Sequence, residues 1–570
     1  MIKSYYITIN NNLIKHKVMK VFITTSGIGS RLLDLTKYTN KSMIKIGKRP
    51  VISYIIDSYP EDTEFVISLG YFGEHVRQYL SLAYPNKKIQ LVEVDKYDGP
   101  GSSQVYSQLQ AEKYLQEPFI YHDCDTIVDN LQEQIPMNFD YNFLVGYEAL
   151  NSELYDAFDY DVNTRLKGKF ESYKLIKTYM KPDSLVGMLS FIGICGIYDY
   201  KTFWQYMHEA INNEKTPYDF LVYHKYGMFK DNLRAIKVDN WTDTGNIAGV
   251  KNARKACKDQ FFILDKNDQA IFIINNKVIK FFAKDGVVDD LITHYEDIKQ
   301  FCQPITQHTK NFLCYEYIDA ENAIDKMNPI RFRKFLEYLR NNNFWEDQSK
   351  KVPNFLFTDS MKKFYIDKNV QRVNQFKEFY NVTEDKDIYI NDILIPKEWT
   401  IERMLNEMSK LFEWNESNPS RWHGDFVLDN ILYDKKKDKY ILLDWRPNFI
   451  NIKEYGDKNY DFGKMNHNLT FNFNSAYNDL FTIDESDPNN IYVNILCNNY
   501  VHDCKEVLKS FVEEHYRVRF AYIEMITGAC WVSMSPLYFL NPVSKFLFYM
   551  GKLTLYVNLM KLLGKEVTTK

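Results

Sequence analysis

The sequence predicts two consecutive parts, an α/β part with a mostly parallel sheet and an α+β part made of two lobes. First, residues 20–250 alternate β-rich runs with helical patterns, which favours a parallel sheet covered on both faces. Second, strand patterns after residue 259 lead into a mainly helical region that begins near residue 318. Third, 570 residues are too many for one hydrophobic core, so two to four domains are expected.

Seven runs in the first part are predicted as strands because β-branched and aromatic residues dominate them. They are Val21–Thr25, Glu64–Leu69, Ile89–Val94, Phe119–His122, Asn142–Gly146, Phe191–Tyr198 and Leu233–Val238. Helices are predicted at Val51–Ser58, Glu74–Leu82 and Ser103–Leu115. Ligands bind beyond the carboxyl ends of parallel strands, which is where the 24–31 loop, Asp123 and Asp125 fall.

The second part begins after a polar, basic stretch that we interpret as a linker. A hairpin is predicted from Phe261–Asp265 and Ala270–Asn275, followed by a strand at Val278–Phe282 and a helix at Asp290–Phe301. Beyond residue 318 the pattern is helical apart from one hairpin at 430–445. The expected division is an extension at 1–18, an α/β domain at 19–250, a linker at 251–258, a first lobe at 259–314 and a helical lobe at 315–570. Met19 begins the first strand pattern and is a candidate translation start.

Composition excludes several classes of protein. The net charge of -4 and pI near 6.3 give no support for a nucleic-acid partner. Eight scattered cysteines without a Cys-x-x-Cys pair fit reduced thiols in a cytoplasmic protein better than disulfides or a zinc site. The sequence has no uninterrupted run of eighteen apolar residues, so a membrane span is not expected. The most apolar region, Phe520–Leu563, is interpreted as core helices. Oligomeric state is not indicated.

A first phosphate-binding pattern follows the first predicted strand. Gly27, Gly29 and Ser30 lie in a strand-turn-helix context where backbone N–H groups can approach a nucleotide phosphate. By itself Gly27-Ile28-Gly29 is equally typical of a tight structural turn. Arg31 and Lys41 add cations suited to a triphosphate.

Two carboxylates that follow predicted strands complete this pattern. Asp125 ends the run Tyr121–Asp125, and Asp243 lies in Trp241-Thr242-Asp243-Thr244-Gly245. Together they are candidate ligands of one Mg²⁺ bound to the nucleotide. Asp123 and Asp243 are also compatible with simple capping of a turn or helix.

Together these motifs resemble the sugar-phosphate and choline-phosphate nucleotidyltransferase family over residues 19–250. The resemblance implies a Rossmann-like domain that joins an NTP and a phosphomonoester and releases pyrophosphate. Thr24-Thr25-Ser26 and Asn40 depart from the family's pattern, which leaves the choice of base open. The attacking phosphate is already ionised, so catalysis requires alignment and charge neutralisation, which Arg31, Lys41 and Mg²⁺ can supply. Lysines between 167 and 181 are candidates for the acceptor phosphate.

A second catalytic pattern lies in the helical lobe. Phosphorylation of an alcohol requires a group that orients and deprotonates the hydroxyl, and Asp425 in His423-Gly424-Asp425 fits that role. Asn430 and Asp444 are candidate Mg²⁺ ligands for ATP. They flank two predicted strands around a lysine-rich turn, which places both at the open end of one hairpin.

This stretch resembles the choline kinase and aminoglycoside phosphotransferase family over about residues 259–570. The resemblance implies a two-lobed, protein-kinase-like fold, with Lys280 as the ATP-phosphate lysine and Glu296 as its candidate ionic partner. Glu296 is also compatible with an ordinary exposed helix charge. No glycine-rich loop is evident near 263–275, and no Arg precedes Asp425, which favours small-molecule substrates over proteins.

The two patterns together predict a bifunctional enzyme of nucleotide-sugar biosynthesis. One half phosphorylates a small hydroxylated metabolite with ATP, and the other converts a phosphomonoester to an NDP derivative, with a sugar as leading substrate. Choline, giving CDP-choline, is the second candidate; an aromatic cage for it from Trp422, Trp445 or Trp531 is weighed against core packing. A nucleotide-binding sensor with one active half and an antibiotic-modifying kinase are the remaining alternatives.

Overall fold

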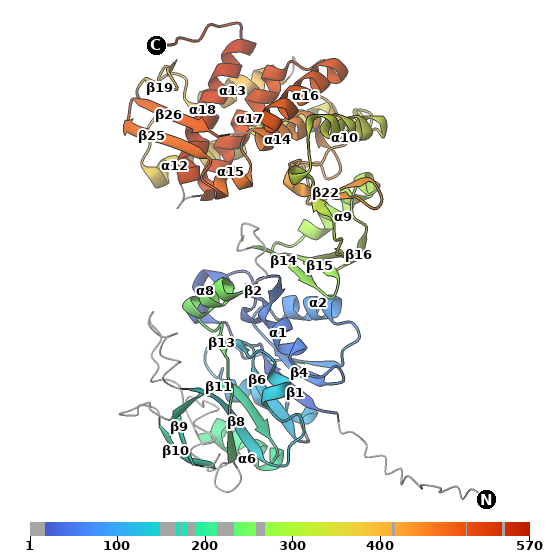
Figure 1. The fold of residues 1–570 in the computed structure, drawn as a ribbon, viewed down its shortest axis with the longest axis vertical. Helices are drawn as coiled ribbons and strands as arrows, with labels where there is room; N and C mark the ends of the chain where they lie inside the picture. Colours follow the sequence, from blue (N-terminus) through green and yellow to red (C-terminus); the bar gives the residue numbers. More distant parts are fainter. Residues whose placement is uncertain are drawn as a thin grey trace, which may run out of the picture. The chain divides into compact units, whose positions relative to one another are not determined.

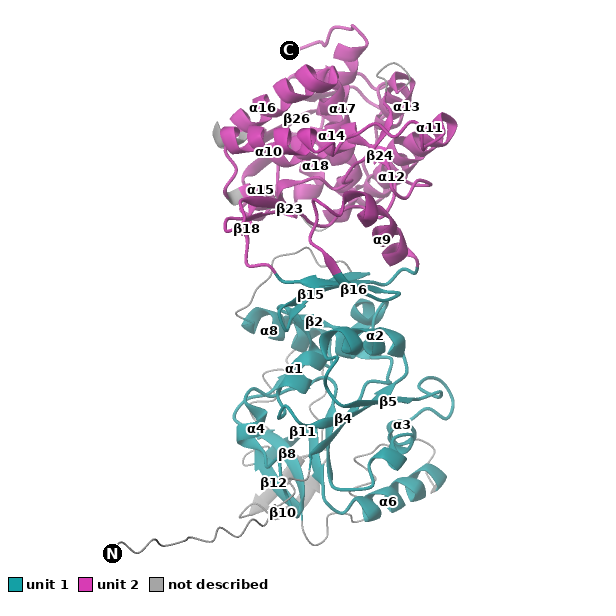
Figure 2. Cartoon of the chain, turned by 90° about the vertical axis from the view of Figure 1, so that its right-hand side faces the viewer, with its two compact units in different colours: residues 1–285, 306–317 teal, residues 286–305, 318–570 magenta. Residues whose placement is uncertain are grey.

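The computed structural model describes residues 18–148, 167–171, 174–179, 188–213, 233–257, 268–412, 417–496, 499–538 and 542–570. The chain forms two compact units, which are coloured separately in Figure 2. Unit 1 comprises Met1–Asp285 and Thr306–Tyr317, and unit 2 comprises Gly286–Ile305 and Ile318–Lys570. Many of the elements are labelled in Figure 1.

Unit 1 contains a nine-stranded sheet of order β5-β4-β1-β6-β11-β8-β12-β10-β9. Its strands are β1 Lys20–Thr24, β4 Glu64–Leu69, β5 Ile89–Glu93, β6 Phe119–Asp123, β8 Asn142–Glu148, β9 Lys167–Glu171, β10 Lys174–Tyr179, β11 Met188–Ile197 and β12 Leu233–Lys237. The four strands β5, β4, β1 and β6 are parallel, as are β8 and β12, whereas β11 runs antiparallel to β6 and β8. The predicted α/β fold of this part is confirmed, and the seven predicted strands are present with ends that differ from the predicted ones by at most three residues.

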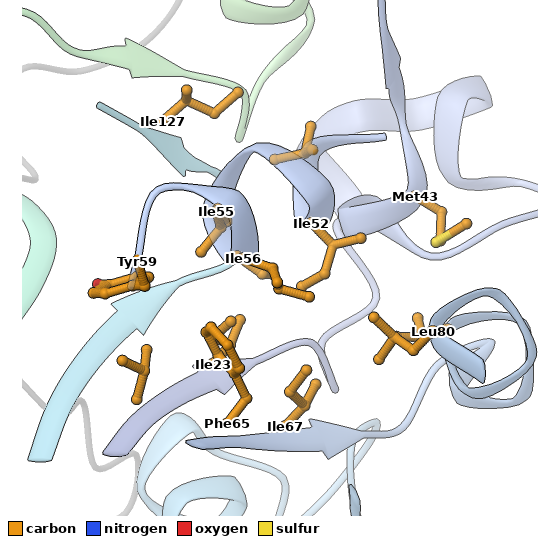
Figure 3. Close-up of a cluster of buried hydrophobic side chains, with 14 of the residues drawn as sticks. Ile23, Met43, Ile52, Ile55, Ile56, Tyr59, Phe65, Ile67, Leu80 and Ile127 are labelled. Carbon is orange, nitrogen blue, oxygen red and sulfur yellow. The ribbon is translucent and has the colours of Figure 1, made fainter. Parts of the chain in front are cut away.

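The described helices of unit 1 include two that the sequence predicts, Val51–Ser58 and Glu74–Leu82, with ends within one residue of the predicted ones. The helices are α1 Val51–Asp57, α2 Gly73–Ala83, α3 Gln104–Leu109, α4 Leu131–Gln134, α6 Tyr200–Asn213 and α8 Ile247–Ala256, with the 3-10 turns η1 Ser30–Thr36, η2 Lys41–Met43 and η3 Glu112–Tyr114. The short strands are β2 Lys45–Ile46, β3 Arg49–Pro50, β7 Thr126–Ile127 and β13 Thr242–Asp243. Figure 3 shows Ile52, Ile55 and Ile56 of α1 over Ile23 and Phe65 of the sheet. The predicted helix Ser103–Leu115 is instead divided into α3 and η3.

A second sheet of unit 1, of order β14-β15-β17-β16, packs against α2. Its strands are β14 Gln269–Ile274, β15 Lys277–Phe282, β16 Ile305–His308 and β17 Phe312–Glu316. Tyr79 of α2 contacts Phe272 and Phe312, with ring centroids 5.3 and 6.3 Å apart. These rings therefore belong to the same hydrophobic core as Ile23 and Phe65.

This second sheet changes one sequence-based expectation. β14 pairs with β15 through a turn at Asn275 and Asn276, both in the left-handed region, as two-residue hairpins favour. The other predicted partner, Phe261–Asp265, lies outside the described residues. Most of the predicted first lobe, 259–314, belongs to compact unit 1 and not to the unit that contains the helical lobe. The predicted domain boundaries themselves stay a prediction.

Unit 2 is predominantly helical. Its helices are α9 Val287–Ile298, α10 Pro329–Asn341, α11 Asn354–Lys362, α12 Lys368–Tyr380, α13 Ile401–Leu411, α14 Lys458–Thr470, α15 Phe473–Tyr477, α16 Asn499–Tyr516, α17 Phe520–Met534 and α18 Pro542–Leu562. Single turns are η6 Ala323–Asp325, the π-turn η7 Lys363–Asp367, η8 Leu428–Asn430 and η9 Ser535–Tyr538. A hairpin of β22 Ile431–Asp434 and β23 Lys439–Leu442, extended by β18 Glu321–Asn322, occupies the predicted position.

The prediction of a single hairpin in the helical lobe is wrong, because unit 2 also contains a sheet of order β20-β19-β26-β25. Its strands are β19 Ile388–Ile390, β20 Ile393–Ile395, β25 Phe481–Asp487 and β26 Asn490–Ile495. A further two-stranded pair joins β21 Pro419–Ser420 and β24 Gly456–Asp457. Three-residue strands and the acidic run of β25 give too little hydrophobic alternation for recognition from sequence.

Helices α17 and α18 form the core that the sequence predicts for this region. Gly528 and Gly551 let them approach closely, since a Cβ at Gly528 would lie 2.6 Å from Leu555 N and 3.0 Å from Gly551 O. Both helices are buried along most of their lengths. Among the described residues, no helix has the combination of length and apolar character required to cross a bilayer.

Two candidate active sites

The glycine loop follows β1 and leads into η1. Gly29 has φ 71°, a left-handed conformation that favours glycine, and a Cβ there would lie 3.1 Å from Lys41 Cβ. A Cβ at Gly27 would meet no atom within 4 Å, so that backbone borders open space. Arg31 is exposed in η1. The loop therefore has the open backbone that close approach of a phosphate requires.

Asn40, which replaces the proline of the family pattern, fixes the position of this loop. Its buried side-chain amide donates to the carbonyl oxygens of Thr25 and Tyr71 at 2.7 and 2.6 Å. Its Oδ1 accepts from the backbone N–H and hydroxyl of Ser42 at 2.9 and 2.8 Å. A proline has no side-chain donor for either carbonyl, so the departure from the family pattern supplies a structural anchor.

Lys41 and Asp125 form an ion pair, with Nζ 2.9 Å from Oδ2 and side chains only 19% and 15% exposed. Burial is the largest single influence and would lower the pKa of Lys41, but the charges of Asp125, Cys124 and Asp123 together with the Asp125 hydrogen bond outweigh it and hold the pKa above its usual value. The structure thus brings together Lys41, predicted to bind the triphosphate, and Asp125, predicted to bind the metal.

Asp125 and Asp243 also lie together, because β7 and β13 pair antiparallel directly beside them. Thr244 donates its backbone N–H and hydroxyl to the Asp125 carbonyl at 2.8 and 2.9 Å. A Cβ at Gly245 would lie 3.0 Å from Asp125 Oδ2 and 3.1 Å from Asp243 Oδ1. Both carboxylates therefore border the same glycine.

This pair of carboxylates fits a magnesium ion whose remaining ligands are phosphate oxygens and water. Mg²⁺ at nucleotide sites usually takes one or two carboxylates and keeps several other oxygen ligands. No group of three or more His, Cys, Asp or Glu side chains suited to a metal occurs in the part of the chain that the structure describes. When bound, the ion would neutralise charge on the α-phosphate and the leaving pyrophosphate.

Asp123 has a different environment from Asp125. Its Oδ1 accepts a 2.6 Å hydrogen bond from the Tyr121 hydroxyl and a 3.5 Å contact from Gln104 Nε2. Its carboxylate also packs directly on the backbone of Gly193, where φ is 85°.

A cavity of about 520 Å³ lies elsewhere, at the amino-terminal ends of the strands near Lys20 and Glu64, and is not part of this site. The lysines between 167 and 181, predicted to contact the acceptor phosphate, have side chains outside the described part of the structure. Their predicted role stays a prediction.

In unit 2, the His423–Asp425 loop is held by a buried carboxylate that the sequence analysis did not select. Asp461 of α14 accepts from the backbone N–H groups of His423 and Gly424 at 2.8 and 2.7 Å. The indole of Trp345 donates to the same carboxylate at 3.1 Å. Burial raises the pKa of Asp461 to about 7, although these three donors favour its ionised form.

Asp425 forms an ion pair with Lys464, whose Nζ lies 3.0 Å from Oδ1. The Asp425 side chain is 41% exposed, while that of Lys464 is 9% exposed. Burial would raise the pKa of Asp425, but Lys464 and Arg446 together hold it well below its usual value. An aspartate of lowered pKa is a weak base, so its main contribution would be to orient a hydroxyl and accept its proton late.

Asn430 and Asp444 flank the β22–β23 hairpin, as predicted. The Asn430 amide donates to the Asp425 carbonyl at 2.9 Å and to Asp425 Oδ2 at 3.4 Å. Leu443 donates its N–H to the Asn430 carbonyl at 2.8 Å, so Asp444 directly follows a residue paired with Asn430. Asp444 is exposed and has φ 59°. Oxygen atoms of an amide and a carboxylate on one hairpin fit a second magnesium ion.

Lys280 and Glu296 occupy different units. Lys280 is buried in β15 of unit 1, with Nζ 5.4 Å from the centre of the Tyr315 ring. Glu296 of α9 in unit 2 forms an exposed pair with Lys299 at 2.9 Å, as an ordinary surface helix charge does. Their pairing stays a prediction.

The three tryptophans considered for an aromatic cage are core residues. Trp422, Trp445 and Trp531 are at most 6% exposed. Trp445 donates its indole N–H to the Leu291 carbonyl at 3.0 Å, and Trp422 packs edge-on to Phe449. The core-packing interpretation therefore holds for these residues.

One stretch of the chain is similar in sequence to a curated protein. Over 81 residues the chain is 33% identical to choline-phosphate cytidylyltransferase of Streptococcus pneumoniae; this stretch is 14% of this chain and about a third (34%) of the relative's length. No family model matches the chain.

Solved structures of nucleotidyltransferases align with 42% of the chain. They include apo UDP-glucose pyrophosphorylase (16% identity, 98% of that chain, TM-score 0.36) and CTP:phosphocholine cytidylyltransferase from Streptococcus pneumoniae (14%, 99%, 0.33). Inositol-1-phosphate CTP transferase from T. maritima also aligns (16%, 97%, 0.32). At these identities and TM-scores the likenesses assign no function to this chain.

Proposed function

We propose that this protein is a nucleotidyltransferase fused to an ATP-dependent small-molecule kinase. The observation that carries the first activity is the convergence of Lys41, Asp125 and Asp243 beside the open glycine loop. In that reaction a phosphomonoester oxygen attacks the α-phosphate of an NTP, a new P–O bond forms, and the bond to pyrophosphate breaks. Lys41 and Arg31 would stabilise the charge that develops.

The kinase activity rests on the arrangement around Asp425 in unit 2. Asp461 holds the loop, Lys464 holds the carboxylate, and Asn430 and Asp444 flank one hairpin. The alcohol oxygen attacks the γ-phosphate of ATP, ADP leaves, and Asp425 takes the hydroxyl proton before releasing it to solvent. The phosphomonoester so formed is the class of acceptor that the first activity consumes.

For the nucleotidyltransferase half, a sugar phosphate remains the leading acceptor on the basis of the Trp241–Gly245 motif. Choline phosphate is the second candidate, and the 81-residue likeness to a choline-phosphate cytidylyltransferase favours it. A sensor with one active half is the alternative from another functional class.

The test is mass spectrometry of products formed by the full chain with Mg²⁺, ATP, CTP, UTP, GTP and dTTP. The acceptor pool contains hexoses, aminosugars, heptoses, alditols, choline and ethanolamine. We expect an NDP-linked product that disappears in Asp125→Ala and in Asp425→Ala. The exposed aspartates Asp129 and Asp503 supply matched control variants, Asp129→Ala and Asp503→Ala. Products from the free alcohol that survive Asp425→Ala would refute the kinase assignment.

A second arm supplies phosphomonoesters directly. NDP formation should then persist in Asp425→Ala and fail in Asp125→Ala. If no NDP product forms from any phosphomonoester, the first half is a sensor and the nucleotidyltransferase assignment falls.

A further inference from the structure

Four cationic side chains gather on the side of Asp425 occupied by α12 and α14. They are Lys368 and Arg372 of α12, Arg446, which follows the β22–β23 hairpin, and Lys464 of α14; we refer to them as the cationic cluster. Arg446 is tied to the catalytic loop, because its Nε donates to the Gly424 carbonyl at 3.1 Å. Lys464 pairs with Asp425 itself. The cluster therefore adjoins the atom that is proposed to orient the alcohol.

Two aromatic rings connect Lys368 to Arg446. Lys368 Nζ lies 3.6 Å from the centre of the Phe364 ring and 5.9 Å from that of Tyr460. The guanidinium carbon of Arg446 lies 5.1 and 5.6 Å from the same two ring centres. Cation–π contacts offset only part of the cost of holding two like charges together.

Few acids balance this charge. Asp425 is the carboxylate that contacts the cluster, and it does so through its ion pair with Lys464. Asp461 is directed at the backbone of the catalytic loop, and Asp457 accepts from the Tyr365 hydroxyl at 2.8 Å and from Asn459 N at 3.0 Å. Arg372 donates to the carbonyl and hydroxyl of Ser533 at 3.1 and 3.0 Å. Among the described residues, Lys368 has no carboxylate within salt-bridge distance.

The pKa of Lys368 reflects this imbalance. Burial is the largest cause, and Arg446 and Arg372 add repulsion, so the pKa lies well below the usual value of 10.5. A half-buried ammonium without a counter-ion destabilises a fold, and such groups concentrate where a ligand is bound.

We propose that the cationic cluster binds an anionic group of the alcohol substrate, so that the kinase half acts on a hydroxylated phosphate or carboxylate. This inference rests on the proposed kinase function and names its substrate class. Choline would instead bring another positive charge beside Lys368 and Arg446. A guanidinium and ammonium groups together are suited to phosphate and carboxylate oxygens.

The binding test measures thermal stabilisation of the full chain by four related probes. Glycerol 3-phosphate and glycerate carry the two kinds of anion, glycerol is neutral, and choline is cationic. We expect one or both anions to stabilise the wild-type protein at concentrations at least about tenfold lower than glycerol or choline. Which anion is preferred separates a phosphate from a carboxylate site.

Lys368→Met tests the assigned residue. It should raise the apparent dissociation constant for the anion about tenfold or more, and Lys368→Arg should restore most of the affinity. Lys410→Met removes a charge from the exposed lysine paired with Glu407 and should change nothing. Lys368→Met should not lower the melting temperature of the unliganded protein, which excludes a merely structural role.

Three results would overturn the proposal: no selective stabilisation by either anion, stronger stabilisation by choline, or an effect of Lys368→Met on Mg²⁺–ATP binding in place of anion binding. The proposed kinase function fails separately. If anions bind through Lys368 but wild-type protein phosphorylates no alcohol, the anion site stands and the kinase assignment falls.

Discussion

Lys41 Nζ and Asp125 Oδ2 lie 2.9 Å apart, so a predicted phosphate-binding cation is also the ionic partner of a predicted metal ligand. The pair is mostly buried, and removal of either member takes away an opposite charge held 2.9 Å from the other. Binding of the nucleotide and binding of the metal at this site are therefore expected to depend on each other.

Lys41→Met tests this dependence. Loss of a cation aimed at developing phosphate charge should lower NDP formation by about 10²-fold or more. It should also weaken magnesium activation, because the Asp125 carboxylate loses its 2.9 Å contact with Lys41. Steady-state kinetics with varied NTP and Mg²⁺ provide the measurement, and Lys37→Met, a change at an exposed lysine, is the control. Unaltered NDP formation in Lys41→Met would exclude a role for this lysine.

Gly245→Ala should act on the metal and not on the nucleotide. The added methyl would lie 3.0 and 3.1 Å from the carboxylate oxygens of Asp125 and Asp243, and it would displace one of them. We expect a higher Mg²⁺ concentration for half-maximal NDP formation. Gly27→Ala is the contrast, since its methyl meets no protein atom within 4 Å. That variant should keep the wild-type melting temperature and raise the KM for NTP; the reverse pattern would contradict the assignment.

Lys464→Met should change the pH dependence of phosphorylation. In the wild-type protein Lys464 and Arg446 outweigh burial and hold the pKa of Asp425 below its usual 3.8, so the carboxylate stays ionised to low pH. Without the positive charge of Lys464, less opposes the effect of burial, so the pKa of Asp425 rises. The acid limb of the kcat–pH profile should therefore move to higher pH.

Lys464→Arg keeps the charge and should therefore leave the acid limb of the kcat–pH profile at its wild-type position. Lys509→Met on α16 is the control for loss of a lysine elsewhere in unit 2. The same sign applies to stability: a lowered folded-state pKa gives stability above pH 3.8 that is lost as the pH falls further. A profile in Lys464→Met that matches wild type would show that the ion pair does not control Asp425.

Gln78→Ala tests the junction between α2 and the second sheet of unit 1. Gln78 Oε1 accepts from the Thr309 hydroxyl at 2.7 Å and from Asn311 N at 2.9 Å, and its Nε2 donates to Asn311 Oδ1 at 3.3 Å. Removing a buried partner of several hydrogen bonds should cost about 1–3 kcal/mol of folding free energy. Urea unfolding followed by tryptophan fluorescence gives the value.

Gln90→Ala, at an exposed position in β5, is the matched control and should remain near wild type. Equal stability of Gln78→Ala and wild type would mean that the second sheet contributes little to unit 1.

Local sequence patterns predicted much of the fold. The strand Glu64–Leu69 has the predicted bounds, because five consecutive buried residues that include Phe65, Val66 and Ile67 leave little ambiguity. The Asn430–Asp444 hairpin and the loop around Gly29 were also placed from residue order alone, since turn chemistry and strand periodicity act over a few residues. The sheet formed by Ile388–Ile390 and its neighbours was missed because such short strands have almost no periodicity.

The sequence by itself determined which chemical groups this protein has and the local elements that present them. Tertiary structure alone decided which groups meet: Lys41 and Asp125 are 84 positions apart, Asp461 and Gly424 are 37 apart, and Gln78 and Asn311 are 233 apart. It also decided that strands predicted for a first lobe share a core with α2 of unit 1. The physical reason is that propensity and periodicity are local, whereas ion pairing, burial and pKa depend on distances that only the packed chain sets.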